Sequence, residues 1–379
     1  MIFTNARMIF PERVADGLSL RVAHGKITEI GPEIRGDQEE VIDLAGNFLA
    51  PGFIDLHVHG AVGRDTMEGT AEAFRAICAY HAGGGTTSLL LTTVTAPIAE
   101  IVRVVDAIEG ARGGISQLRG VHVEGPFIAP EKHGAQREEF IVEPRPGLVA
   151  QLLQRPEAIE RVTLAPEVPG GRDLIALLTK LGIASSGGHS AAWDEEARAG
   201  FEQGMRQVTH TFNCMSTTRR RARERVAGLL EFALSEPQIF CELIADGRHV
   251  SATLMRMLYR AKGATGICLV TDAIAGAGLP NETHFSLFGT DCVVTGGACW
   301  LADGSALAGS SSRMIDLVKW MVAELGLPLA EVVRMATETP ARAMAWKSKG
   351  RLEVGLDADL VVLSPELNVL RTLCSGEPL

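Results

Sequence analysis

The sequence predicts an α/β fold, a (β/α)8 TIM barrel with a small β-sandwich domain formed from both chain ends. Three observations lead to this prediction. Short apolar runs alternate with helical segments from residue 51 onward, polar residues cluster just after the apolar runs, and both chain ends contain short strand-like stretches. Alternating strands and helices are typical of repeated βα units around a parallel sheet.

The two ends of the chain predict the small domain. Their strand-like stretches are bounded by Gly, Pro and Asp, which favour turns. The candidates are Ile2–Ala6, Leu18–Ala23, Lys26–Ile30, Glu40–Asp43, Leu352–Val354 and Leu360–Leu363. We expect residues 1–50 and 350–379 to pair into one β domain, and residues 51–349 to form the barrel.

The central region supplies a candidate for each of the eight barrel strands. They are Phe53–His57, Thr87–Leu91, Gly120–Glu124, Val162–Pro166, Ile183–Gly187, Gln207–Thr211, Phe240–Ala245 and Ile267–Asp272. Helical segments between them include Thr70–Ala82, Ile98–Glu109, Asp173–Leu181, Glu195–Gln203 and Ser251–Ala261. Residues 276–307 resemble an insertion of turns and strands, and Ser311–Leu325 and Ala330–Trp346 are predicted as closing helices.

The composition excludes several classes of partner. The 379 residues carry a net charge of −10, which disfavours a general affinity for nucleic acid or for an anionic membrane. No apolar run reaches the ~18 residues of a membrane span, and the first ten residues lack the features of a signal peptide. The seven cysteines are scattered without a CxxC pair, as in reduced cytoplasmic proteins. We expect a cytoplasmic location and no nucleic-acid or membrane partner.

Histidine and acidic residues gather where barrel strands end, which is where this fold carries its reactive groups. His57 and His59 end the first strand and are two apart, so they point to the same side. Glu124 ends the third strand, His189 follows the fifth and His210 lies on the sixth. Two histidines and a carboxylate leave a position open for water at a catalytic zinc ion. Any one of these histidines alone is better read as a satisfied core or surface residue, but together they favour a metal site.

Three further polar residues lie at the same strand ends. Asp55 and His122 precede the candidate ligands, and they either orient those ligands or fill the barrel interior as buried polar groups. Asp272 ends the last strand, where a carboxylate can take a proton from water and return it to a leaving amine. The alternative for Asp272 is a helix N-cap, and its position favours catalysis.

One dense basic run follows the sixth strand. Arg219–Arg225 begins nine residues after His210 and contains five arginines. Such a run is either a solvated surface or, at this position, a source of paired N–H donors for a phosphate over the barrel mouth. Arg248 and His249, just after the seventh strand, could join it in the second case. The residues themselves leave both interpretations open.

Taken together, these stretches resemble the N-acetylglucosamine-6-phosphate deacetylase family of the amidohydrolase superfamily. The matching stretches run in family order over nearly the whole chain. They are Pro51–Gly60, His122–Phe127, Gly188–Ser190, Thr209–Asn213, Asp246–His249, Thr271–Ala273 and Leu307–Ser310.

The resemblance implies a metal centre and an acid/base residue. Glu124, His189 and His210 would hold the principal ion, and His57 with His59 would hold a second ion in members that keep this pair. One or two divalent ions per subunit are therefore expected, with zinc as the first candidate and iron or another divalent metal as alternatives. Asp272 would be the acid/base.

The resemblance also implies a substrate and its contacts. The family hydrolyses the N-acetyl amide of N-acetylglucosamine 6-phosphate to glucosamine 6-phosphate and acetate, and forms homodimers in which a phosphate contact can cross between subunits. The positions that match its sugar-phosphate contacts are Ala135, Gln136, Asn213, Cys214, Arg221, His249, Leu307, Ala308 and Gly309. Arg221 is chosen because it lies eleven residues after His210, which is the family's spacing for its phosphate arginine.

Three departures from the family pattern lie on the substrate side. Cys214 replaces an alanine, Gln136 replaces a histidine that touches the substrate carbonyl, and the arginine-rich run replaces Arg-Glu-Pro-Gly. The alternatives are therefore a deacetylase of N-acetylgalactosamine 6-phosphate or of another N-acyl compound, and more remotely a non-catalytic sugar-phosphate-binding protein. A hydantoinase or dihydroorotase is disfavoured, because the fourth strand ends Leu164-Ala165-Pro166-Glu167 without the lysine that bridges their metals.

Overall fold

The computed structural model describes residues 1–36, 39–287, 289–304 and 307–379, and an eight-stranded parallel sheet lies at its centre. The strands are β6 (Phe53–Val58), β9 (Thr86–Thr92), β10 (Leu118–Glu124), β11 (Ile159–Leu164), β12 (Ala184–Gly187), β13 (Gln207–Val208), β16 (Phe240–Leu243) and β17 (Ile267–Leu269). They follow one another around the sheet in this order. Each overlaps one predicted strand, so the predicted barrel is confirmed.

The barrel is nearly closed where its first and last strands meet. The Asp272 backbone N–H donates to the His57 carbonyl at 2.9 Å, and Val58 forms a parallel bridge with Ala273. The Asp55 carboxylate accepts from the backbone N–H of Thr271 at 3.2 Å and from its hydroxyl at 2.6 Å. This seam brings the end of β17 beside the end of β6.

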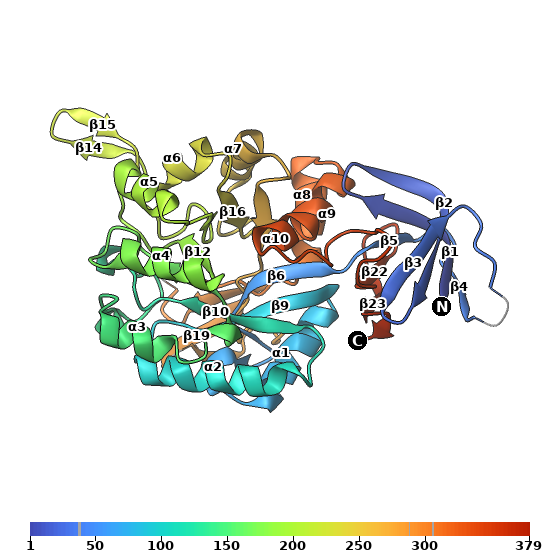
Figure 1. The fold of residues 1–379 in the computed structure, drawn as a ribbon, viewed down its shortest axis with the longest axis horizontal. Coiled ribbons are helices and arrows are strands. Elements are labelled where there is room, and N and C mark those ends of the chain that lie inside the picture. The colour runs from blue at the N-terminus through green and yellow to red at the C-terminus, as the bar shows by residue number, and fades with distance from the viewer. Residues whose placement is uncertain (37–38, 288, 305–306) are drawn as a thin grey trace.

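Helices cover the outside of the barrel (Figure 1). They are α1 (Ala71–Ala82), α2 (Ile98–Arg112), α3 (Pro146–Leu152), α4 (Gly171–Leu181), α5 (Asp194–Glu202), α6 (Leu229–Ser235), α7 (Ala252–Lys262), α8 (Met314–Leu325), α9 (Leu329–Met335) and α10 (Glu338–Ala343), with 3-10 turns η1 (Thr66–Glu68), η2 (Pro130–Lys132), η3 (Glu138–Phe140) and η4 (Pro156–Ala158). The buried faces of α1 to α9 share one apolar core with the strands, and Ala341 of α10 packs in a smaller cluster with Ile54 and Leu56 of β6. Within the described ranges, no helix combines the length and apolarity that crossing a bilayer requires.

The predicted closing helix over 330–346 is wrong in one respect, because the chain divides it into α9 and α10. Pro340 has no N–H to donate to the carbonyl four residues earlier, at Ala336. That carbonyl instead accepts a hydrogen bond from Ile54 of β6 at 2.8 Å. The break therefore ties the closing helices to the first barrel strand.

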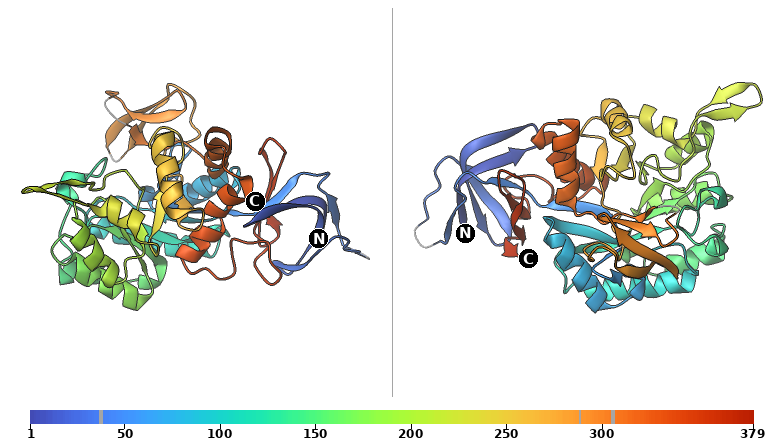
Figure 2. Two further views of the ribbon diagram at one scale, coloured as in Figure 1. Left: turned by 90° about the horizontal axis from the view of Figure 1, so that it is seen from above. Right: turned by 180° about the vertical axis from the view of Figure 1, so that it is seen from behind.

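Strands from both chain ends form one mixed sheet beside the barrel, in which both termini lie (Figure 2). Its strands are β1 (Ile2–Phe10), β2 (Arg13–Ala23), β3 (Lys26–Gly31), β4 (Val41–Asp43), β5 (Phe48–Pro51), β22 (Leu360–Leu363), β23 (Val369–Cys374) and β24 (Glu377–Pro378). The two ends meet where β22 pairs antiparallel with β5. This sheet has its own apolar core, which includes Phe3, Leu20 and Leu360. The predicted pairing of the chain ends is confirmed.

One predicted strand of this sheet, Leu352–Val354, is wrong. The segment is irregular, with Leu352 buried in the small core and Val354 exposed. Hydrogen bonds to β3 begin just after this segment, where Gly355 donates to Ile27 and Leu356 accepts from Ile27. Gly355 has φ 95°, a left-handed turn conformation that stops a strand from extending.

The predicted insertion is a four-stranded antiparallel sheet, apart from residues 288 and 305–306, which lie outside the described residues. It consists of β18 (His284–Leu287), β19 (Thr290–Thr295), β20 (Ala298–Leu301) and β21 (Leu307–Gly309). Its apolar face packs on Ile274, two residues after Asp272. Two small ribbons complete the chain, β7 (Gly60–Ala61) with β8 (Arg64–Asp65) and β14 (Arg219–Arg221) with β15 (Glu224–Val226).

Candidate metal centre and pocket

The five candidate ligands converge at the carboxyl ends of the barrel strands. They form two triads, His57–His59–Glu124 and Glu124–His189–His210, and the ligand atoms within each lie within 4.8 Å of one another. All five side chains are buried. The structure therefore brings together residues that are up to 153 positions apart in the sequence (from 57 to 210) around a shared glutamate.

Glu124 lies between the two pairs of imidazoles. Its Oε1 is 3.3 Å from His189 Nε2, 3.2 Å from His210 Nε2 and 3.5 Å from His57 Nε2. Its Oε2 is 3.3 Å from His59 Nε2. The carboxylate is thus in a position to serve both triads.

The chemistry of this donor set fits a divalent cation. The Nε2 atoms of His57 and His59 are 3.1 Å apart, and those of His189 and His210 are also 3.1 Å apart. A proton can be shared by only two such nitrogens at a time. A metal cation can be bound by the lone pairs of several nitrogens and of the carboxylate together. Imidazole and carboxylate are the ligands of zinc and of neighbouring transition metals.

The electrostatics of the site also favour positive charge. Burial alone would lower the pKa of His57, but Asp272, Glu124 and Glu242 outweigh it and raise this pKa well above its ordinary value. Burial is likewise outweighed at His59, where Asp272 and Glu124 raise the pKa to about 9. The acidic groups around these imidazoles therefore stabilise a positive charge between them.

Hydrogen bonds from neighbouring groups orient the ligands. His189 Nδ1 lies 2.8 Å from the carbonyl of Lys132, which accepts its proton and leaves Nε2 free to bind a cation. Gln136 donates from Nε2 to Glu124 Oε2 at 2.6 Å, and its own Oε1 accepts from the backbone N–H of Thr95 at 2.7 Å. Gln136 therefore contacts the shared glutamate in addition to lining the pocket.

Asp272 lies beside the triad of His57, His59 and Glu124. Its Oδ1 is 3.4 Å from His57 Nε2 and 3.3 Å from His59 Nε2. Burial would raise the pKa of Asp272, but the two histidines lower it below its ordinary value. An ionised carboxylate at this position can accept a proton from a water molecule between the histidines and the cavity.

The backbone is strained at the residues that carry the site. His189, His210, Cys214 and Asp272 have φ of 47°, 29°, 48° and 49°, a region that residues other than glycine seldom adopt. Such strain persists only where surrounding contacts hold it, and it is concentrated at functional sites. These conformations turn the side chains toward one another at the strand ends.

Asp55 and His122 lie deeper in the barrel than the ligands and are fully buried. Asp55 accepts from the backbone N–H of His57 at 3.3 Å as well as from Thr271, and burial raises its pKa to about 7. His122 lies between the hydroxyls of Thr92 and Thr163, and burial lowers its pKa well below the ordinary value. Both side chains are hydrogen-bonded, and Asp55 contacts the backbone of a ligand directly.

Two buried charged residues beneath the ligands were not identified from the sequence. Glu242 on β16 contacts His57, and Arg161 on β11 pairs with Glu242. The available signal was a charge inside an otherwise apolar strand, as in Phe240–Leu243. Such residues are almost never fully buried unless they are paired, so each of these charges implied a partner.

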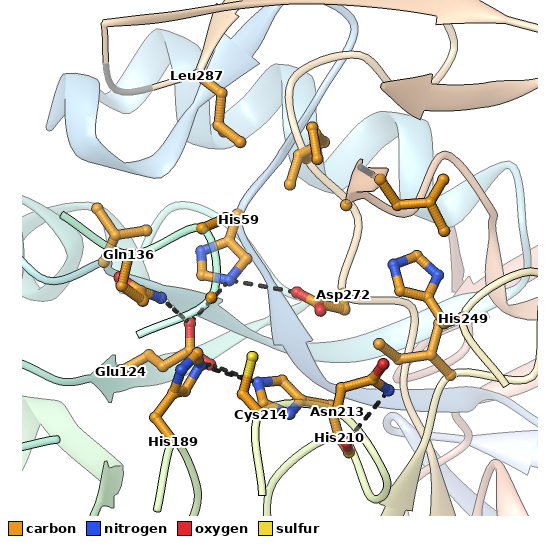
Figure 3. A pocket seen from close by; sticks show the side chains of 18 of the residues that line it. His59, Glu124, Gln136, His189, His210, Asn213, Cys214, His249, Asp272 and Leu287 are labelled. Carbon is orange, nitrogen blue, oxygen red and sulfur yellow. Dashed lines mark hydrogen bonds and ion pairs between the residues drawn. The ribbon is translucent and has the colours of Figure 1, made fainter. Parts of the chain in front are cut away.

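A cavity of about 410 Å³ opens above the candidate ligands. Figure 3 shows His59, Glu124, His189 and His210 with Asp272 on one side of it, and Leu287 of the insertion on the other. The predicted substrate residues that line this cavity are Ala135, Gln136, Asn213, Cys214, His249, Leu307, Ala308 and Gly309. Sequence analysis did not identify the apolar wall formed by Ile244, Ile274, Leu287 and Leu301. The cavity thus combines polar groups at its base with an apolar wall to which the inserted sheet contributes Leu287 and Leu301.

Arg221 is not among the residues that line this cavity. It lies on the β14–β15 hairpin, which stands away from the barrel in every view (Figures 1 and 2). Its exposed guanidinium pairs with Glu195 and lies 4.8 Å from the centroid of the Trp193 ring. The arginine-rich run is therefore a surface hairpin of this subunit.

Arg248 and His249 do line the cavity. Arg248 donates from Nη2 to the carbonyl of Gly296 in the inserted sheet at 2.6 Å, which leaves other N–H groups available. His249 Nδ1 lies 2.6 Å from Asp246 Oδ2, and this carboxylate raises the pKa of His249 against the effect of burial. These two side chains give one wall of the cavity a cationic character.

The chain is similar over its whole length to known proteins. Residues 48–379 match the amidohydrolase family. N-acetylglucosamine-6-phosphate deacetylase of Lysinibacillus sphaericus is 32% identical over 99% of this chain and 97% of its own length. N-acetylgalactosamine-6-phosphate deacetylase of Escherichia coli O157:H7 is also 32% identical, over 98% of this chain and 97% of its own length.

A solved structure is similar to the same extent. A mutant N-acetyl-D-glucosamine-6-phosphate deacetylase from Mycobacterium smegmatis, in complex with N-acetyl-D-glucosamine-6-phosphate, has a TM-score of 0.92 and 29% identity. The comparison covers all of this chain and 98% of the other. The similarity therefore extends to the barrel, the small sheet and the insertion alike.

Proposed function

Because the chain belongs to the N-acetylglucosamine-6-phosphate deacetylase family of the amidohydrolase superfamily, we propose that it hydrolyses the N-acetyl amide of N-acetylglucosamine 6-phosphate. The products are glucosamine 6-phosphate and acetate. The observation that carries this proposal is the Asp272 carboxylate, 3.3 Å from His59 and 3.4 Å from His57, at the base of a cavity of about 410 Å³. A binding protein has no need of an acid/base beside its metal ligands.

Glu124, His189 and His210 would hold a principal divalent ion, and His57 and His59 would share Glu124 with a second ion. Zinc is the first candidate, with iron or another divalent metal as alternatives, because the nitrogen and oxygen ligands suit all of them. The chemistry that such an ion would supply is that of a Lewis acid, which would lower the pKa of water toward ~7 and polarise the acetyl carbonyl.

Asp272 would move the proton that the amide nitrogen must receive before it can leave. It takes the proton from water as the water oxygen forms a bond to the acetyl carbon. It then gives the proton to the amide nitrogen as the C–N bond breaks. The water oxygen leaves in acetic acid, which ionises to acetate and releases the second water proton to solvent. The nitrogen leaves as the amine of the sugar, so no oxidant or further reactant is needed.

The remaining cavity residues would bind the sugar phosphate. Gln136, Asn213 and Cys214 lie near the ligands, and Leu307 to Gly309 form the facing edge of the inserted sheet. His249 would hold the phosphate, with Arg248 on the same wall. Arg221 would reach the phosphate of the neighbouring subunit in a homodimer, a role that the exposure and projection of its hairpin support.

A cytoplasmic location forms part of the proposal. All seven cysteines are free thiols, and six of them are buried. Unpaired cysteines in this number are typical of proteins kept in a reducing compartment.

The test is acetate release by protein of measured metal content. N-acetylglucosamine 6-phosphate, its 4-epimer and unphosphorylated N-acetylglucosamine would be compared by kcat/KM. We expect the highest value with N-acetylglucosamine 6-phosphate, loss of activity after chelation and its return when zinc is added. No acetate release from this substrate by the metal-loaded protein would overturn the proposal.

N-acetylgalactosamine 6-phosphate is the second candidate substrate. It is supported by the 32% identity to the Escherichia coli enzyme named for that sugar, which equals the identity to the Lysinibacillus enzyme. The departures at Gln136 and Cys214 lie on the cavity wall, where a change in sugar stereochemistry would be accommodated. A higher kcat/KM for the 4-epimer in the same assay would establish this alternative.

A further inference from the structure

A chain of buried polar side chains crosses the barrel directly beneath the candidate metal ligands. It begins at the Val58 backbone, passes between side chains of several barrel strands and ends at His57. The contacts, in order, are Val58 N to Thr92 Oγ1 (3.0 Å), Thr92 Oγ1 to His122 Nδ1 (3.3 Å), His122 Nε2 to Thr163 Oγ1 (2.7 Å), Thr163 Oγ1 to Thr209 Oγ1 (2.7 Å), Thr209 Oγ1 to Ser186 Oγ (2.7 Å), Arg161 Nη2 to Ser186 Oγ (2.8 Å), Arg161 Nη1 to Glu242 Oε1, and Glu242 Oε2 to His57 Nδ1 (3.2 Å). The chain of contacts therefore returns to the strand where it began.

Glu242 and Arg161 are the charged members of this chain of contacts. Their side chains are 2% and 0% exposed. One carboxylate oxygen of Glu242 accepts from Arg161, and the other contacts His57 Nδ1 and accepts from the backbone N–H of His210 at 3.0 Å. Besides contacting each other, Glu242 contacts the candidate metal ligands His57 and His210, and Arg161 contacts Ser186 in the chain of polar side chains below them.

Stability gives a poor explanation of this ion pair. Taking two charges out of water costs several kcal/mol per ion, and replacing a buried pair with apolar residues is often neutral or stabilising. A role in positioning explains it better. A carboxylate can only accept a hydrogen bond, so its contact with Nδ1 places the proton of His57 there and directs the Nε2 lone pair to the cation.

The effect of Glu242 differs between the two triads. In the first triad its side chain holds the ring of His57 itself. In the other triad the Glu242 side chain contacts the backbone N–H of His210 and not its ring. This backbone has a second support, because the N–H of Thr211 donates to the main-chain carbonyl of Glu242 at 2.9 Å. The ring of His189 depends instead on the Lys132 carbonyl. A change in the Glu242 side chain therefore acts mainly on the triad of His57, His59 and Glu124.

We propose that Glu242, held by Arg161, is a positioning residue for a second metal ion bound by His57, His59 and Glu124. The inference rests on the proposed two-metal hydrolase, and it adds a residue that controls how many ions the site retains. Loss of the carboxylate leaves the His57 ring free to turn, and the second ion is lost before the first.

Two double variants separate positioning from stability. R161M/E242M replaces the ion pair with apolar side chains of similar size and removes the acceptor for His57. R161M/E242Q also removes both charges but keeps an oxygen that can accept from His57 Nδ1. The pair differs only in the group that faces His57, so differences in metal binding report on that contact.

We expect R161M/E242Q to retain two zinc ions per chain and R161M/E242M to retain one after dialysis, as measured by elemental analysis. In a competition titration with a chromophoric chelator, the second ion should bind roughly 10–100-fold more weakly to R161M/E242M. Equal affinities in the two double variants, or an equal loss of both ions from R161M/E242M, would overturn the proposal.

Glu338→Gln is the matched control, because Glu338 on α10 is also a buried, ion-paired glutamate, with Oε2 2.5 Å from Nε of Arg334 on α9. It should lower the melting temperature without changing the metal content. If R161M/E242M does not fold, Glu242→Asp replaces it. This variant keeps a charge for Arg161 but withdraws the oxygen from His57, and the same loss of the second ion is expected.

The metal titrations use no substrate. If the protein releases no acetate from any N-acetyl sugar, the proposed function fails while the predicted change in metal stoichiometry can still be observed. If acetate is released but the two double variants bind zinc alike, only the positioning role fails.

Discussion

The backbone of Asp272 has a φ of 49°, a conformation that residues other than glycine seldom adopt. Its backbone N–H donates to the His57 carbonyl, and its own carbonyl accepts from Ser310 at 3.2 Å. These two bonds fix the strained residue between β6 and the segment that follows β21. The carboxylate is consequently aimed at the imidazoles of His57 and His59, with 16% of the side chain open to solvent.

Asp272→Asn tests whether this carboxylate transfers the proton. The amide has nearly the same shape but cannot accept a proton, so we expect kcat to fall by roughly 10²–10⁴-fold or more. Binding of the principal ion should persist, because Glu124, His189 and His210 are unchanged. Steady-state acetate release and elemental analysis of the same preparation check both statements. A variant with near-normal kcat would contradict the assigned role.

Two elements carry the cationic groups that could bind a phosphate. Arg248, after β16, lines the cavity of its own subunit and is fixed to the inserted sheet through Gly296. Arg221, on the β14–β15 hairpin, lies outside that cavity and is fixed through Glu195 and the Trp193 ring. If both arginines bind phosphate as proposed, Arg248 would act within its own subunit and Arg221 on a neighbouring molecule.

Arg221→Met and Arg248→Met compare these two elements. A hydrogen bond to a charged group contributes about 1.5–3 kcal/mol, so loss of a phosphate contact should raise KM for the phosphorylated sugar by roughly 10–100-fold. KM for unphosphorylated N-acetylglucosamine should not change. Parallel kinetics on both sugars measure the difference. An unchanged KM for the phosphorylated sugar in either variant would remove that arginine from the phosphate site.

A mixed dimer identifies the subunit on which Arg221 acts. When Arg221→Met and Asp272→Asn chains are combined, a contact across the interface leaves one site with both Asp272 and an intact arginine. That site should recover the native KM for the phosphorylated sugar. A contact within one subunit predicts no recovery in the mixture.

The small sheet is joined to the barrel partly through Asp357, in the segment that returns from α10. Its carboxylate pairs with Lys26 of β3 at 2.6 Å and with Lys349 at 3.1 Å, and it accepts from the Ser348 hydroxyl at 2.8 Å. Burial would raise the pKa of Asp357, but these partners lower it from 3.8 to about 2. The side chain is 18% exposed, so solvent screens part of the attraction.

Asp357→Asn should lower the free energy of unfolding at pH 7 by on the order of 1 kcal/mol. This value is smaller than the free energy equivalent to the whole pKa shift, because solvent screens the partly exposed carboxylate. A depressed folded-state pKa stabilises the protein above the unfolded pKa. The difference in the free energy of unfolding between wild type and variant should therefore decrease as pH falls from about 4 toward 2. Urea unfolding of the metal-free proteins across this pH range tests the prediction. A difference in the free energy of unfolding that stays constant with pH would contradict it.

The barrel strands and the candidate ligands could be predicted from the sequence, whereas one division between helices was missed. Barrel strands were predictable because continuous apolar runs between helices mark buried parallel strands. The ligands were predictable because this fold places reactive groups at strand ends. The division between α9 and α10 was missed although Pro340 signals it, since the apolar pattern continues across the break.

The role of Glu242 could not be predicted in the same way. Its two side-chain partners, Arg161 and His57, are 81 and 185 positions away in the sequence. A charge in an apolar strand indicates that a partner exists, but the sequence does not say which strand supplies it. The apolar wall from Leu287 and Leu301 was missed for the same reason, because an inserted sheet can fold over the cavity or away from it.

The sequence by itself determined the fold class, the pairing of the two chain ends and the residue types that follow each barrel strand. Local patterns suffice for these features, because residue spacing sets both the element and the direction of its side chains. Only the tertiary structure decided that Glu124 lies between two pairs of imidazoles, that Glu242 contacts His57 and that Arg221 lies outside its own cavity. Those relations arise when distant segments are brought together by closure of the barrel and by the paths of its loops, which local spacing does not specify.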